Sequence, residues 1–104
     1  MTTPSPMTTP SLTSTSLRVE ADRLRNELDS QVLGYLKAHP GCRAAALALA
    51  AGSEVKALLA FVTKHHVPGY PRNPDQSRAI DRSLQRLRRK KAVVFASASG
   101  WHPA

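Results

Sequence analysis

A dense run of arginines that leads straight into β-branched residues constrains this chain more than any other stretch. Residues 76–95 are QSRAIDRSLQRLRRKKAVVF. Up to Lys90, the apolar residues Ile80, Leu84 and Leu87 recur every three or four positions, which is the period of an amphipathic helix. The following AVVFAS is rich in residues that favour strands. The segment therefore predicts a basic helix over about 74–90, joined without a linker to a strand.

Turn-forming residues mark both ends of this unit. PGYPRNP, residues 68–74, is an irregular connection, after which Asn73 is a plausible N-cap with Pro74 at the first helical position. After the strand, ASG predicts a turn and WHPA a short return strand. We expect a β-hairpin from about 92 to 102.

Three further helices are expected upstream. The first has an apolar stripe and an N-cap at Ser16, and it should end at His39, before Pro40 and Gly41. Asp29 and Ser30 allow a break that would cap a second segment, 30–38. CRAAALALAAG then predicts a short helix ended by Gly52, and SEVKALLAFVTKHHVP predicts another, capped by Ser53. The stripe of the first helix comprises Leu17, Leu24, Leu28, Val32 and Leu36.

The first sixteen residues consist almost entirely of Thr, Ser and Pro. Such a segment has too little apolar surface to offset the entropy of ordering, so we expect a disordered tail over 1–16 and a single domain over 17–104.

The charge of the chain is concentrated in one region. The formal net charge is +8, and residues 68–91 alone carry eight basic and two acidic side chains, whereas 92–104 carry none. This distribution predicts a polyanionic partner. The single cysteine excludes an intrachain disulfide, and no run of 18 apolar residues or signal peptide is evident. These features favour a cytoplasmic, nucleoid-associated protein that does not bind membranes.

On a helical wheel, one polar ridge lies opposite Ile80, Leu84 and Leu87. Arginine can bind guanine through two hydrogen bonds, glutamine can pair with adenine, and both can contact phosphate. The alternative is an ordinary solvated face, but such faces usually mix both signs of charge, and only two aspartates offset the arginines here. The ridge consists of Arg78, Arg82, Gln85 and Arg89, with Arg86 at its edge.

The order of these segments resembles the winged helix-turn-helix family. IDRSLQRLRRKKAVVF…GWHP is similar to its recognition helix and two-stranded wing, and VLGYLKAHPGCRAAALALAAG is similar to its first two helices. The resemblance covers about residues 30–104. It implies a mainly α fold with a small β-hairpin, and a transcriptional regulator that binds double-stranded DNA with a helix in the major groove. The candidate DNA contacts are Arg72, Ser77, Arg78, Arg82, Gln85, Arg86, Arg89, Lys90, Lys91 and Ser99.

The chain departs from this family in one respect, because residues 53–75 insert a whole extra helix before the basic one. An alternative register makes 54–66 the recognition helix. Few of the outward residues of that helix can bind base edges, so the basic helix is favoured. Those outward residues would be Lys56, Ala57, Ala60, Thr63 and Lys64.

No other pattern indicates chemistry. The four histidines and Cys42 lack the spacing of a zinc site, and there is no glycine-rich phosphate loop or activated nucleophile. We therefore expect no enzymatic activity, no cofactor, no metal and no small-molecule ligand.

Two questions stay open at this point. The leucines of the first helix either cover one side of the domain or, through residues 17–36, form a homodimer that would bind two-fold symmetric DNA. The basic face either binds DNA or, as a protein-interaction module or inhibitor, docks on an acidic protein partner.

Overall fold

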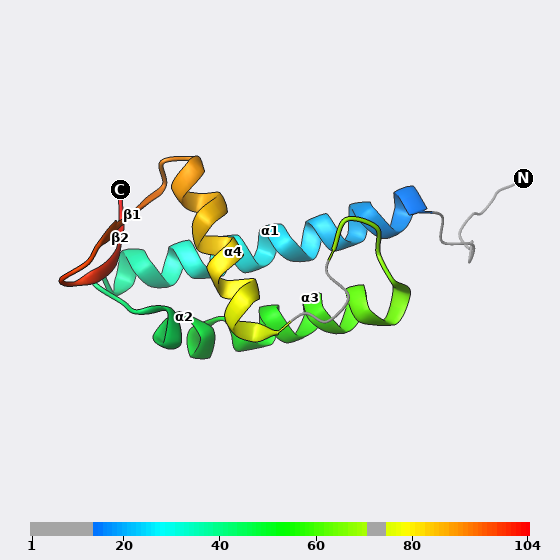
Figure 1. The fold of residues 1–104 in the computed structure, drawn as a ribbon, viewed down its shortest axis with the longest axis horizontal. Coiled ribbons are helices and arrows are strands. Elements are labelled where there is room, and N and C mark those ends of the chain that lie inside the picture. Colours follow the sequence, from blue (N-terminus) through cyan, green and yellow to red (C-terminus); the bar gives the residue numbers. More distant parts are fainter. Residues whose placement is uncertain (1–13, 71–74) are drawn as a thin grey trace, which may run out of the picture.

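The computed structural model describes residues 14–70 and 75–104 and shows a mainly α fold with a C-terminal hairpin (Figure 1). This confirms the predicted fold class, and the arrangement is consistent with a winged-helix-like architecture. The tail expected over 1–16 lies mostly outside the described residues, as do Arg72, Asn73 and Pro74. The elements are α1 (Ser14–Ala38), α2 (Ala44–Ala50), α3 (Gly52–His65), α4 (Gln76–Arg89), β1 (Val93–Ala96) and β2 (Gly100–Pro103).

Helix α1 is a single helix of 25 residues that begins two positions before Ser16. The predicted break at Asp29 is wrong, because the Asp29 side chain accepts hydrogen bonds from α4 instead of capping a new helix. The second half of its leucine stripe is fully buried within the chain, and Leu17 and Leu24 pack against the same core. The stripe thus covers one side of this domain.

Helices α2 and α3 meet at Ala51 with a bend of 79°. Gly52 was predicted to end α2 and Ser53 to cap α3, but Gly52 is already the first residue of α3 and Ser53 lies in its first turn. Helix α3 runs back along α1 (Figure 1) and buries Val55, Leu58 and Val62 against it.

Helix α4 crosses α1 and α3 steeply (Figure 1) and contacts all three other helices. Its N-cap is Asp75, whose carboxylate accepts a hydrogen bond of 2.8 Å from the backbone N–H of Arg78. The predicted cap at Asn73 is therefore two residues too early, since either side chain can cap a helix but the helix begins at Gln76. The buried face comprises Ala79, Ile80, Ser83, Leu84 and Leu87.

The hairpin pairs β1 with β2 in antiparallel register and is tied to the connection between α1 and α2. Trp101 donates its backbone N–H to the Cys42 carbonyl at 2.8 Å, and its own carbonyl accepts from Gly41 at 2.9 Å. Val93 and Trp101 are buried in the core. The hairpin is thus fixed to the helical body rather than extending freely from it.

Within the described ranges no single helix is long and apolar enough to cross a membrane, and α2 and α3 meet that criterion only together, as a bent pair.

Candidate nucleic-acid interface

The outer face of α4 presents the predicted polar ridge to solvent. Arg78, Arg82 and Arg89 are exposed, and the Arg78 side chain is 74% exposed. Gln85 is half-buried, whereas Ser77 at the start of the helix is exposed. The ridge therefore lies opposite the face that packs on the core.

Most of the positive charge on this helix is not neutralised by carboxylates. Arg78 lies 3.6 Å from the Asp75 carboxylate, which is an exposed and weak pair. By contrast, five cations on α4 and just after its last residue have no ion-pair partner among residues 14–70 and 75–104. They are Arg82, Arg88, Arg89, Lys90 and Lys91, all of them exposed.

Arg86, which was predicted at the edge of the DNA face, makes a contact within the fold. Its guanidinium binds the buried Asp29 carboxylate through two hydrogen bonds of 2.9 and 2.7 Å. The Ser83 hydroxyl donates to the same carboxylate at 2.6 Å. Because this network joins α4 to α1, Arg86 holds the basic helix in place. A serine between Ile80 and Leu84 was the sequence signal for such a buried polar network.

The charge of α4 increases towards its C-terminal end. The first turns contain Asp75 and Asp81 beside Arg78 and Arg82, so their formal charges cancel. The last turn contains three arginines, and two lysines follow it. Cations at this end also interact favourably with the helix dipole. The C-terminal end of α4 is therefore the part of the helix with the highest density of positive charge.

The wing has a different surface character. Its tip, residues 97–99, is exposed and uncharged, and the Ser99 hydroxyl lies 2.7 Å from Nε2 of His102. Val94 and Phe95 are about half exposed. The Arg43 guanidinium donates to the Ala98 carbonyl at 3.4 Å. The wing thus offers hydroxyl and backbone groups rather than charge.

Helix α3, the alternative recognition helix, lies against α1 and α4. Its exposed side is the one expected from the sequence and carries two lysines among small and uncharged residues. The exposed residues are Ser53, Lys56, Ala57, Ala60, Thr63 and Lys64.

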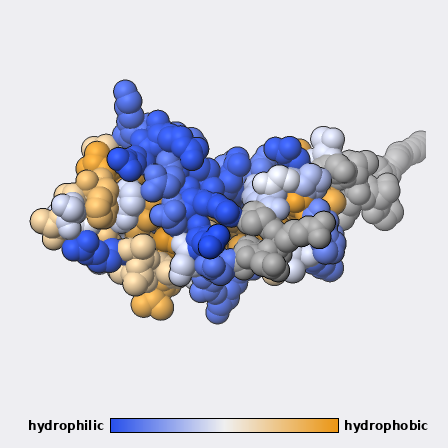
Figure 2. Space-filling view, in the orientation of Figure 1, coloured by the Kyte–Doolittle hydropathy of each residue, from blue (hydrophilic) through white to orange (hydrophobic). Residues whose placement is uncertain are grey.

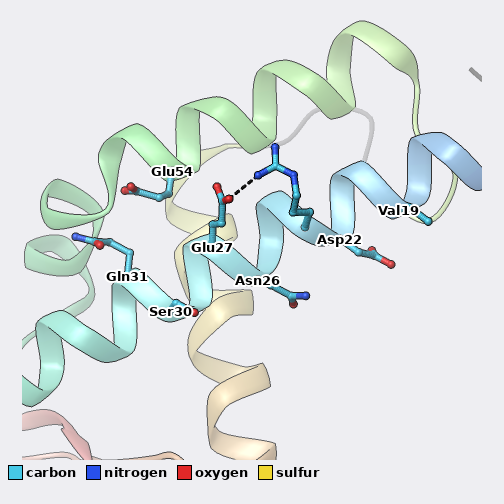
Figure 3. A pocket seen from close by; sticks show the side chains of 8 residues that line it. Val19, Asp22, Asn26, Glu27, Ser30, Gln31 and Glu54 are labelled. Carbon is cyan, nitrogen blue, oxygen red and sulfur yellow. Dashed lines mark hydrogen bonds and ion pairs between the residues drawn. The ribbon is translucent and has the colours of Figure 1, made fainter. Parts of the chain in front are cut away.

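A groove of about 720 Å³ lies along the outer face of α1 and reaches Glu54 of α3 (Figure 3). It is acidic, because three carboxylates line it, those of Asp22, Glu27 and Glu54, against the single guanidinium of Arg23. Arg23 is itself paired with Glu20 at 2.6 Å and with Glu27 at 2.5 Å. The hydrogen bond from Arg23 lowers the pKa of Glu20. No group of three or more metal-binding side chains occurs in the described part of the chain.

Surface hydropathy also distinguishes α4 from the end of the molecule that contains the hairpin. Figure 2 shows a strongly hydrophilic band over α4, whereas the end formed by the hairpin and α2 is more hydrophobic. Leu49 of α2 is 87% exposed at that end. The basic helix and the apolar end are adjacent but separate surfaces.

Comparison with known proteins finds no match to a protein family, a curated protein or a solved structure.

Proposed function

We propose that this chain binds double-stranded DNA in a sequence-specific manner, with α4 as its recognition helix. The observation that carries the proposal is the set of five exposed cations on α4 and just beyond it that have no carboxylate partner in the described ranges. Neutralising phosphates supplies nearly all of the non-specific affinity of proteins for DNA and a large share of the specific affinity, and it requires free lysine and arginine side chains.

The two ends of α4 are suited to different contacts. Ser77, Arg78 and Arg82 lie in its N-terminal half, where recognition helices usually contact base edges. Arg88 to Lys91, at the C-terminal end, are suited to phosphates, which fix register without reading sequence. Arg86 is excluded from both sets because it binds Asp29.

A protein with these contacts is a small regulator of transcription that works on the nucleoid. A two-fold symmetric complex would need a dimer, and a homodimer through residues 17–36 stays a prediction. The buried part of the α1 stripe is committed to the core of the same chain, so any dimer would use other surfaces of that helix.

The test is a selection of random duplexes on the purified protein, followed by titrations of specific and random duplex. Arg78→Ala should weaken specific binding by about tenfold or more and relax the preference at one position. Because the Arg78 side chain is largely exposed, thermal melting should be unchanged. A wild-type protein that shows no preference for any selected duplex would refute sequence-specific binding.

A second candidate is docking on an acidic protein partner, and the apolar surface of the hairpin favours it. Val94 and Phe95 are about half exposed beside a basic helix, and such a combination suits a protein interface. If selection enriches no duplex while Phe95→Ser abolishes binding to an acidic partner, this candidate replaces the first.

A further inference from the structure

A second basic site lies between α1, the segment that follows α3, and α4. This segment passes over α1 (Figure 1), and its residues Gly69 and Tyr70 line one side of an open hollow of about 550 Å³. The volume falls within the range of small-molecule sites. Four guanidinium groups line the hollow, together with one carboxylate and one phenol. The lining residues are Arg18, Asp22, Arg25, Gly69, Tyr70, Arg82 and Arg86.

The charges of this hollow are not balanced. Its one carboxylate, Asp22, accepts a hydrogen bond of 2.8 Å from the Tyr70 hydroxyl and lies 3.6 Å from Arg25. Arg86 is neutralised by Asp29, but Arg18 and Arg82 have no ion pair within 14–70 and 75–104. Two positive charges therefore remain in excess.

Two of the arginines are held back from bulk water. The side chains of Arg25 and Arg86 are 33% and 22% exposed. The Arg25 Nε is buried and has no hydrogen-bond partner among the described residues. A buried N–H without an acceptor is unfavourable by about 1–3 kcal/mol, so the fold tolerates this arrangement rather than gaining stability from it.

We propose that this hollow binds a small molecule carrying a diphosphate or several phosphate groups. Arginine binds phosphate oxygens through paired, charge-assisted hydrogen bonds, and several converging guanidinium groups favour a multiply charged anion over a single carboxylate. A DNA backbone fits less well, because Arg25 and Arg86 are recessed while a duplex first meets the exposed side chains of α4.

The site would regulate α4, and this consequence rests on the proposed DNA binding. Arg82 lines the hollow and also belongs to the DNA-facing ridge. A guanidinium that binds a phosphate in the hollow is withdrawn from DNA, so ligand and duplex should compete. Sequence patterns did not indicate this site, because Arg18 and Arg25 lie about sixty residues from Arg82 and only the tertiary fold brings them together.

Calorimetric titration of the full chain with inorganic pyrophosphate at constant ionic strength tests the site itself. We expect saturable binding at one site, weakened about tenfold or more by Arg18→Gln and by Arg25→Gln. Arg88→Gln removes the same charge from α4 outside the hollow and should change affinity by less than about twofold. If wild type does not bind at millimolar pyrophosphate, or if Arg88→Gln weakens binding as much as Arg18→Gln, the proposal is wrong.

Folding is checked by thermal melting. Should Arg25→Gln unfold, Arg18→Gln decides the question alone, because Arg18 is exposed and outside the core.

Duplex titrations separate this proposal from the function on which its regulatory consequence rests. Saturating pyrophosphate should lower wild-type DNA affinity beyond the effect of sodium chloride at equal ionic strength, and Arg18→Gln should abolish that difference. Pyrophosphate binding without any DNA binding supports the site and refutes the proposed function. DNA binding without pyrophosphate binding supports the proposed function and refutes the phosphate site. If both bind without competing, the regulatory link through Arg82 is refuted.

Discussion

Gly100, where the second strand begins, sets how closely the hairpin approaches the α1–α2 connection. Its φ of 97° is in the left-handed region, and a Cβ built there would lie 2.6 Å from the Cys42 carbonyl oxygen. Backbone atoms cannot move away cheaply, so Gly100→Ala should lower the free energy of unfolding by roughly 2 kcal/mol or more. Urea denaturation measures the change.

Gly34 provides the matched control for that substitution. It is exposed within α1, and a Cβ there would meet nothing within 4 Å. Gly34→Ala should therefore stabilise the protein by about 0.5–1 kcal/mol through the higher helix propensity of alanine. Equal stabilities for the two variants would show that the hairpin does not pack on Cys42 as the structure has it.

Tyr70 should make the protein sensitive to alkaline pH. Partial burial, together with the hydrogen bond that it donates to Asp22, raises the pKa of Tyr70 from 10.0 to about 12. The unfolded chain therefore loses the phenol proton first, and the stability of the folded state should fall as pH rises from about 10 towards about 12. Tyr70→Phe should remove this loss.

The difference between the near-ultraviolet titrations of wild type and Tyr70→Phe isolates this one phenol of the two in the chain. A midpoint at the ordinary value would contradict the contact with Asp22. An unchanged alkaline stability profile in Tyr70→Phe would contradict the linkage.

At the scale of elements, the contact between α1 and α4 depends on Asp29. Its carboxylate is only 7% exposed and binds Arg86 and Ser83. Asp29→Ala would leave a largely buried guanidinium without a counter-charge, and it should lower the free energy of unfolding by about 3 kcal/mol. Urea denaturation again measures the loss.

The control is Glu27→Ala on the outer face of α1, which removes an exposed ion pair and should change stability by less than about 0.5 kcal/mol. The double variant Asp29→Ala, Arg86→Met should recover much of the loss, because it removes the uncompensated charge. If Asp29→Ala is as stable as wild type, the network does not hold α4 on α1.

The elements show which inferences a sequence supports. Local patterns were sufficient for four helices and the hairpin, because periodic leucines, prolines and β-branched runs act over a few residues. They misplaced the ends of helices by one or two residues, because several neighbouring residues can serve as caps, and they failed outright where a distant residue decided the outcome. Aspartate is a residue type that often caps helices, yet the hydrogen-bond partners of Asp29 are 54 and 57 residues away. The role of Arg86 and the hollow beside Tyr70 were missed for the same reason, whereas the exposed ridge of α4 followed from one helix alone.

At the scale of the whole molecule, charge is separated between surfaces. The groove on α1 is acidic, and α4 concentrates the excess behind the net charge of +8. A molecule polarised in this way orients itself before contact with a polyanion, and the effect falls as salt rises. The protein surface that neutralises phosphates, and so releases counterions from the DNA, is therefore identifiable from salt dependence.

The salt dependence of duplex binding should assign the interface to α4 rather than α3. Each phosphate contact contributes about 0.9 to the slope of log affinity against log salt. Single substitutions of Arg88, Arg89, Lys90 or Lys91 by glutamine should thus each lower that slope by up to about one, with little change in melting because all four are exposed. Lys56→Gln and Lys64→Gln remove the same charge from the exposed side of α3. They should leave the slope unchanged.

The opposite result would be that the two α3 variants flatten the salt dependence while the four α4 variants do not. In that case the DNA lies against α3, and the basic end of α4 serves only to complement its own helix dipole.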